Sequence, residues 1–238
     1  MAGHSKWANI RFRKELKDKR KGKLFSKLAQ DITIAVRLGG PNPETNPRLR
    51  MALEAAKSAN LPKENIERAI KRGTGESAGK LEEFFIEGYG PEGVAVLIRA
   101  VSDNKNRTLG EIRQVFNKFG GKLAEAGGVK WMFEQKGRIV LSESQSKSKE
   151  EVELAIIDSG AEDYEEEGGL IIVYTSPQKL EEVKENLRKA GLKIERVSLG
   201  FEPKNVVEVE ESKKEGVLKF LEALEELDDV SEVYANLG

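Results

Sequence analysis

Residues 73–79, GTGESAG, separate two stretches with different hydrophobic patterns, and this change limits the possible folds more than any other feature. Before this segment, apolar residues recur every three or four positions, which is typical of amphipathic helices. Beyond it, apolar stretches of strand length alternate with helical patterns. The segment itself has the small, flexible residues of a linker. We therefore expect a helical domain, a linker and an α/β part.

Three helices are predicted before the linker. The first covers 23–38, where apolar side chains recur every four residues until a glycine pair ends it. The second begins at Asn46, an N-cap residue followed by Pro47 at the first helical position. The third covers 62–72 and is expected to end at Gly73. Short helices with short connections predict a small bundle.

Strands and helices alternate beyond the linker. We expect helices near 108–119, 149–159, 177–190 and 212–227, and strands near 82–88, 93–101, 128–134, 137–142, 162–166, 169–175, 192–200, 204–209 and 229–236. The helix at 108–119 has the clearest pattern, and Thr108 with Glu111 is expected to form its capping box. Residues 138–200 have the order βαββαβ, which is typical of a ferredoxin-like domain.

The pieces on either side of that βαββαβ stretch are incomplete by themselves. Residues 82–134 form half a domain, and 204–238 form a βαβ piece that cannot bury its own apolar face. We expect the two to combine into a second ferredoxin-like domain, into which the first is inserted. The predicted domains are a basic helical domain (1–78), a discontinuous α/β domain (79–134 and 204–238) and an inserted α/β domain (135–203).

Charge is distributed very unevenly along the chain. Residues 1–72 hold 18 Lys+Arg and 7 Asp+Glu, a formal charge of +11, whereas residues 73–238 hold 22 and 34, a charge of −12. This asymmetry predicts a module that binds a polyanion, joined to an acidic body. Abundant Lys and Glu without any Cys also predicts a protein adapted to high temperature.

The most basic stretch is the first two dozen residues, and it is the predicted nucleic-acid site. Lys and Arg neutralise phosphates, and the release of counterions drives binding. For Trp7, stacking on an unpaired base and packing against the bundle are equally open interpretations. The candidate nucleic-acid-binding residues are Lys6, Trp7, Arg11, Arg13, Lys14, Lys17, Lys19, Arg20, Lys21 and Lys23. The alternative for the cluster is a solvated basic tail.

A second candidate site lies at residues 102–108, SDNKNRT, between a predicted strand and a predicted helix. Backbone amides at a helix N-terminus favour anions. Asn104, Asn106 and Arg107 would add donors for a phosphate or a carboxylate, so they form a possible anion or partner site. Helix capping and a polar turn explain the same residues equally well.

Signs of enzymatic chemistry are weak. Gly88, Gly90 and Gly93 match the spacing of a dinucleotide-binding loop, but a strand follows them instead of a helix, so we expect a hairpin turn. The acids of 163–167 could bind Mg²⁺, although an exposed acidic hairpin is the favoured interpretation. His4 is the one histidine, and the chain has no cysteine. We therefore expect no catalytic residues, no metal site and no cofactor.

Six ordered segments make the chain resemble the YebC family: MAGHSKWANI, NPRLR, NIERAIKRGTGE, EGYGPEGVAVL, DNKNRT and GGVKWMFEQKG. The resemblance implies an α+β multidomain fold, with an N-terminal three-helix bundle and two ferredoxin-like α/β domains around a central cleft. It also implies DNA binding and regulation of transcription, although some members are described as translation factors that act at the ribosome and ease the synthesis of proline runs. The family's basic motif includes Lys6, Trp7, Arg11, Arg13, Lys14, Lys17, Arg20 and Lys23, and Phe12 stands where many relatives have His.

We therefore expect a cytoplasmic, non-enzymatic protein that binds nucleic acid and regulates transcription. The alternative within this class is a translation factor that contacts ribosomal RNA and the ribosome. The alternative from another class is a metal-dependent enzyme that uses carboxylates such as Glu83 or Asp103 in the cleft. No apolar stretch approaches the roughly 20 residues that would span a bilayer, so no membrane partner is expected.

Overall fold

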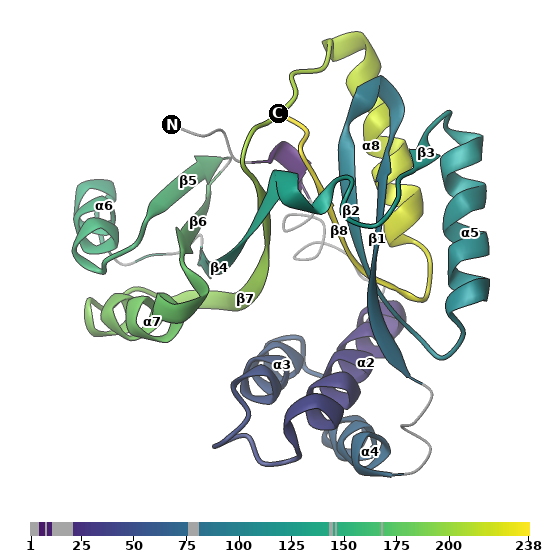
Figure 1. Ribbon diagram of the computed structural model, residues 1–238. Coiled ribbons are helices and arrows are strands. Elements are labelled where there is room, and N and C mark those ends of the chain that lie inside the picture. Colours follow the sequence, from purple (N-terminus) through teal and green to yellow (C-terminus); the bar gives the residue numbers. More distant parts are fainter. Residues whose placement is uncertain are drawn as a thin grey trace. The chain divides into compact units, whose positions relative to one another are not determined.

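The computed structural model describes residues 5–7, 9–10, 21–75, 81–142, 145, 147–167 and 169–238 (Figure 1). The fold is α+β, with an N-terminal helical bundle and two four-stranded sheets. The chain divides into a larger unit, Met1–Phe133 with Pro203–Gly238, and an inserted unit, Glu134–Glu202. Within the described ranges, no helix has the length and apolar character needed to cross a membrane.

Three helices form the bundle of the larger unit: α2 (Lys21–Gly39), α3 (Pro47–Ser58) and α4 (Lys63–Thr74). Their apolar faces meet in one core, to which Ile32 and Leu49 contribute fully buried side chains. Asn46 caps α3 as predicted, because its Oδ1 accepts a hydrogen bond from the Leu49 amide at 3.0 Å. The Asn46 amide group also donates to the carbonyl of Ala35 at 2.7 Å, so one side chain joins the end of α2 to the start of α3.

Gly73 does not end α4, and this expectation from the sequence is wrong. The helix continues to Thr74, with Gly75 at its C-cap. A Cβ atom on Gly73 would lie 2.7 Å from Val36 Cβ and 2.8 Å from the Thr33 carbonyl oxygen. The glycine is therefore required by the close approach of α4 to α2, and not by a left-handed C-cap.

The sheet of the larger unit has the order β3-β1-β2-β8, built from β1 (Glu82–Tyr89), β2 (Ala95–Ser102), β3 (Lys122–Leu123) and β8 (Val230–Ala235). The neighbouring strands, β1 with β2, β1 with β3 and β2 with β8, all pair antiparallel. Helices α5 (Lys105–Lys118) and α8 (Glu211–Glu225) lie together over one face (Figure 1). The predicted strand at 204–209 is wrong, because only Val207 forms an isolated bridge, to Leu237.

Two glycines allow these helices to approach the sheet closely. A Cβ on Gly88 would lie 2.4 Å from a ring carbon of Phe116 in α5, and a Cβ on Gly90 would lie 2.4 Å from a ring carbon of Phe220 in α8. The two phenyl rings meet edge to face, with centroids 5.0 Å apart. The predicted hairpin turn is confirmed, since β1 turns into β2 over the short 3₁₀ helix η2 (Pro91–Gly93).

The inserted unit has its own sheet, in the order β5-β6-β4-β7. Its elements follow the βαββαβ order: β4 (Phe133–Leu141), α6 (Lys149–Asp158), β5 (Asp163–Glu167), β6 (Leu170–Thr175), η4 (Pro177–Lys179), α7 (Leu180–Lys189) and β7 (Ile194–Pro203). Separate strands were predicted at 128–134 and 137–142, and this is wrong, because β4 runs unbroken through Gly137 after the 3₁₀ helix η3 (Lys130–Met132). A Cβ on Gly137 would lie 2.8 Å from Leu180 Cδ1, so this glycine also serves close packing.

Helix α5 begins one turn earlier than expected, and the predicted capping box of Thr108 and Glu111 is wrong. Asn104 is the N-cap, and its Oδ1 accepts a hydrogen bond from the Arg107 amide at 3.1 Å. Thr108 lies fully buried inside the helix, where its hydroxyl donates to Asp229 Oδ2 at 2.6 Å. The polar residues before Thr108 were taken for a turn, although Asn104 already provides the cap.

Candidate nucleic-acid interface

The structure places only part of the predicted basic cluster. Arg11, Arg13, Lys14, Lys17, Lys19 and Arg20 lie outside the described residues, as does His4. Lys21 is the first residue of α2. The amide of Lys6 donates to the carbonyl of Leu237 at 2.9 Å, so the described N-terminal residues run beside the last residues of the chain.

Trp7 lies in the core of the larger unit. Its side chain is 1% exposed and belongs to the cluster that includes Val96, Phe220 and Val233. The indole Nε1–H donates to the carbonyl of Val233 at 3.0 Å, and the Ser5 hydroxyl donates to the carbonyl of Ala235 at 2.6 Å. The sequence left open stacking on a base and packing against the bundle, but the ring packs in the core between the sheet and its helices, and it offers no face to solvent.

Lys23 and Lys27 bind the C-terminal end of α8. The Lys23 ammonium donates to the carbonyl of Glu226 and lies 3.3 Å from that residue's carboxylate and 3.6 Å from the carboxylate of Asp228. The Lys27 ammonium donates to the carbonyl of Glu225 at 2.7 Å. Cations are favoured there because the last carbonyls of a helix carry partial negative charge. Lys23 therefore has an intramolecular role in this conformation.

A cationic face that the sequence analysis did not single out lies on α4. Its apolar residues, Ile66, Ala69 and Ile70, pack into the bundle core. At 100° per residue, Arg68, Lys71 and Arg72 project from the opposite side of the helix. These three side chains are exposed, and they form no ion pair with any residue in the described part of the chain. We call them the α4 cationic face.

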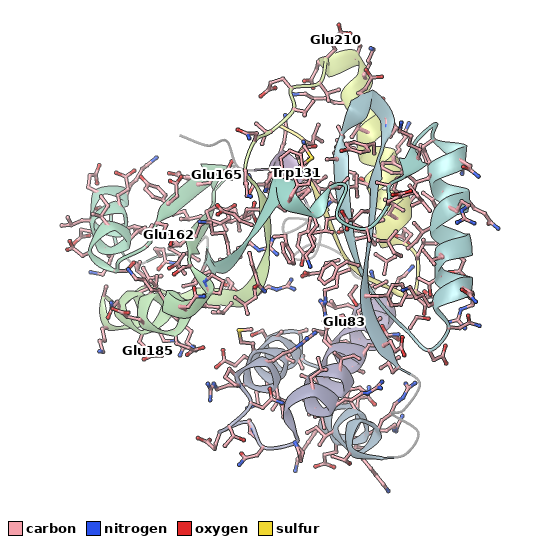
Figure 2. All side chains as sticks on the ribbon, viewed as in Figure 1. Glu83, Trp131, Glu162, Glu165, Glu185 and Glu210 are labelled. Carbon is pink, nitrogen blue, oxygen red and sulfur yellow. The ribbon has the colours of Figure 1, made fainter. Side chains whose placement is uncertain are left out.

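A network of charges joins the bundle to the sheet, on the face opposite α5 and α8. Arg99 of β2 forms ion pairs with Asp31 of α2 and, at 2.8 Å, with Glu83 of β1, and it lies 3.9 Å from Glu232 of β8. Arg48 of α3 also binds Glu83, through a hydrogen bond of 3.0 Å. Figure 2 labels Glu83 at the end of β1 that faces the bundle. Glu83, a carboxylate considered for catalysis, is thus engaged by two arginines.

Burial and the neighbouring charges together set the pKa values of the side chains in this network. Burial raises the pKa of Asp31 above its ordinary value, and the attraction of Arg99 only partly opposes this shift. For Glu83 burial acts in the same direction, but hydrogen bonds and charge from Arg48 and Arg99 outweigh it and lower the pKa. Burial would lower the pKa of Arg99, yet the surrounding carboxylates raise it. Arg99 therefore stays charged, and the network holds the bundle on the sheet.

The predicted anion site at the start of α5 contains an internal carboxylate. Asp229 Oδ2 accepts hydrogen bonds from the hydroxyls of Ser102 (2.9 Å) and Thr108 (2.6 Å) and from the Arg107 guanidinium (2.9 Å). Burial would raise the pKa of Asp229, but these hydrogen bonds, Thr108 first, lower it.

Asp103 and Asn106, two other polar residues at the start of α5, are not bound to Asp229 in the described structure. Asp103 forms an ion pair with Arg107 at 3.2 Å, and Asn106 is exposed in the first turn of the helix. In this conformation Arg107 is thus engaged by two carboxylates of the chain itself, those of Asp103 and Asp229, and Asn104 serves as the helix cap. Binding of an external anion or partner at these residues stays a prediction.

A loop before β4 presents an exposed aromatic ring. Glu87, 6% exposed, accepts hydrogen bonds from the amides of Gly127 (2.8 Å), Val129 (2.7 Å) and Lys130 (2.7 Å). Burial would raise the pKa of Glu87, but these three amides lower it. The loop leads to Trp131, which is 65% exposed. In the sequence, GGVKWMFEQKG served only as a mark of resemblance, and a tryptophan three residues after a glycine pair was the available signal.

The acidic hairpin of the inserted unit is not arranged as a metal site. Glu166 binds Lys149 at 2.6 Å, and Asp163 accepts a hydrogen bond from the amide of Tyr164. Nowhere in the described ranges do three or more His, Cys, Asp or Glu side chains gather so that they could hold a metal ion. Residues 76–80, which include part of the predicted linker, lie outside the described residues.

Comparisons with known proteins cover almost the whole chain. A family model described as the TACO1/YebC protein N-terminal domain matches residues 5–76, and one described as the TACO1/YebC second and third domain matches residues 81–237. A protein of Thermotoga maritima is 54% identical over 99% of this chain and 93% of its own length, and one of Carboxydothermus hydrogenoformans is 50% identical over 99% and 98%. Both are named probable transcriptional regulatory proteins.

A solved structure shows the same fold. The crystal structure of a conserved hypothetical protein from Aquifex aeolicus superposes with a TM-score of 0.85. It is 50% identical in sequence, over 93% of this chain and 91% of that one. The matches to both family models, with relatives of about half-identical sequence over nearly the full length, establish the relationship. The chain belongs to the TACO1/YebC family.

Proposed function

We propose that this protein is a non-enzymatic, DNA-binding regulator of transcription, and that its basic N-terminal domain provides the binding surface. Membership of a family whose relatives are named for transcriptional regulation supports the regulatory role. The formal charge of +11 over residues 1–72 supports nucleic acid as the partner. The ion pairs of Glu83 and Asp103 leave neither carboxylate arranged as a general base.

The observation that carries this proposal is the α4 cationic face. Arg68, Lys71 and Arg72 lie on one side of a helix whose other side is buried, so the helix is held in place while its cations remain hydrated. Such a surface can contact phosphates without rearrangement of the bundle. The basic residues that precede α2 in the sequence would add further phosphate contacts.

Fluorescence anisotropy with a labelled DNA duplex, repeated at several salt concentrations, tests the proposal. The triple variant Arg68→Ala, Lys71→Ala, Arg72→Ala should bind more weakly and with a shallower dependence of log K on log salt, by up to about 0.9 per lost contact. The matched control is Lys179→Ala, Arg188→Ala, Lys189→Ala, which removes three exposed cations from the inserted unit. Equal losses in both variants would show a nonspecific charge effect and would contradict the proposed surface.

Crosslinking in cells, followed by sequencing of the bound nucleic acid, tests the identity of the target. We expect enrichment of chromosomal DNA at discrete positions, and the α4 triple variant should lose it. Recovery of ribosomal RNA in place of DNA would contradict regulation of transcription and would indicate regulation of translation. It would leave the basic surface in place as the point of contact.

A further inference from the structure

Trp131 is a large aromatic residue with an unusual environment. It lies in η3 and is 65% exposed, and Figure 2 labels it at the turn that leads into β4. Its indole Nε1–H already donates to the carbonyl of Gly128 at 3.1 Å. The group that solvent meets is therefore mainly the π-surface of the ring. Exposing such a ring has a hydrophobic cost that a purely structural loop would avoid.

The loop that carries Trp131 is held firmly. The Glu87 carboxylate accepts hydrogen bonds from three amides of this loop at 2.7–2.8 Å. The Tyr89 hydroxyl donates to the Gly128 carbonyl at 3.2 Å. Hydrogen bonds to a charged acceptor are the stronger kind. The ring is thus presented by a preorganised loop, so a ligand would lose little free energy in ordering it.

Two lysines lie close to Trp131 along the backbone. The ammonium of Lys130 lies 4.8 Å from the centroid of the Phe85 ring in β1. The amide of Lys204 donates to the carbonyl of Met132 at 2.9 Å, so Lys204 lies beside η3. Its side chain is exposed and forms no ion pair with a residue in the described ranges.

Few large apolar side chains in the described residues are as exposed as that of Trp131. Among the described residues, the other large apolar side chains with comparable exposure are Leu38 on α2 and Leu154 and Ile157 on α6. A protein-docking face needs a contiguous apolar patch, whereas a single exposed ring with lysines at neighbouring backbone positions suits one stacked base. Base stacking on an aromatic ring tolerates any sequence, because every base has a π-face.

We infer that Trp131 is a stacking platform for an unpaired nucleobase, with Lys130 and Lys204 as contacts to the adjoining phosphates. This site would bind single-stranded DNA or RNA, or a base that has left a duplex. It rests on the proposed function, since it adds a second, base-contacting site to the phosphate-binding surface of the helical domain.

The two tryptophans make a direct test possible, because Trp7 is 1% exposed and Trp131 is 65% exposed. Oligo-dT and oligo-U should quench the tryptophan fluorescence of the full-length protein. The Trp131→Phe variant should still bind these oligonucleotides, but its fluorescence should no longer be quenched. Trp131→Ala should weaken binding by about 5-fold to 150-fold, as expected for one stacked base. It should leave the slope of log K against log salt unchanged. Lys204→Ala should make that slope shallower by the amount expected for one phosphate contact. Ile157→Ala, which truncates another exposed apolar residue, is the matched control and should bind normally.

The possible failures are distinguishable. Salt-dependent binding of the oligonucleotides without quenching, and with an unchanged affinity of Trp131→Ala, would overturn the stacking site and leave the proposed function standing. The absence of any nucleic-acid binding would overturn both. A wild-type dimer that Trp131→Ala converts to a monomer in sedimentation would assign the ring to contact between copies, and would also overturn the stacking site.

Discussion

Substitution of Trp7 by alanine should reduce the stability of the larger unit and should leave the salt dependence of nucleic-acid binding unchanged. The ring is 1% exposed and packs among residues of the sheet and of α8. Truncation of a buried tryptophan to alanine costs about 3–5 kcal/mol. The loss of the Nε1–H bond to the Val233 carbonyl adds about 1 kcal/mol. For a unit of this size, the melting temperature should fall by roughly 8–24 °C.

Differential scanning calorimetry measures this effect, with circular dichroism to confirm that the variant is folded at low temperature. Trp131→Ala is the control, because an exposed side chain away from such packing should change the free energy of unfolding by less than about 0.5 kcal/mol. The opposite pattern would refute the reasoning. If Trp7→Ala melted like the wild type but lost nucleic-acid affinity, Trp7 would be a contact residue and not part of the core.

Three further substitutions test the packing and the charge networks. Arg99→Ala should lower the free energy of unfolding by about 3–5 kcal/mol, because it leaves three carboxylates close together without their shared cation, and urea titration checks this. Asp229→Ala should cost about 2–3 kcal/mol at neutral pH. Since the folded pKa of Asp229 is lowered, its contribution is present above roughly pH 4 and is lost as pH falls through the folded pKa, so wild type and variant should converge in acid melts. Gly90→Ala should cost about 1–3 kcal/mol through its clash with Phe220, and an unchanged melting temperature would contradict the close approach.

Local patterns in the sequence predicted the secondary structure well where one residue type had one physical role. Asn46 followed by proline indicated a helix start, and Asn46 caps α3. The nearly continuous apolar stretch in 93–101 indicated a strand, and β2 covers Ala95–Ser102. The predictions were wrong where a glycine had more than one possible role. Gly73 was interpreted as the end of a helix, but it lies inside α4, where α2 approaches the backbone.

The candidate site depends on contacts between residues that are distant in the sequence, and these could not be predicted. Nothing near Arg99 in the sequence indicates that Asp31 and Glu232 would surround it. The residues before α5 left helix capping and an anion site equally open, and nothing near them in the sequence indicates Asp229, which lies 122 residues from its partner Arg107. The basic composition of residues 1–72 did indicate the kind of ligand to expect, because net charge needs no tertiary structure to be read.

The salt dependence of DNA binding tests the central proposal most directly. For about five phosphate contacts, log K should fall with log salt at a slope of roughly −3.5 to −4.5. A variant with Lys14, Lys17, Lys19 and Arg20 replaced by alanine should have a shallower slope, by about 0.9 per lost contact, and should bind all sequences more weakly. If that variant binds DNA and ribosomal RNA as tightly as the wild type at low salt, the basic segment is not the site of nucleic-acid binding.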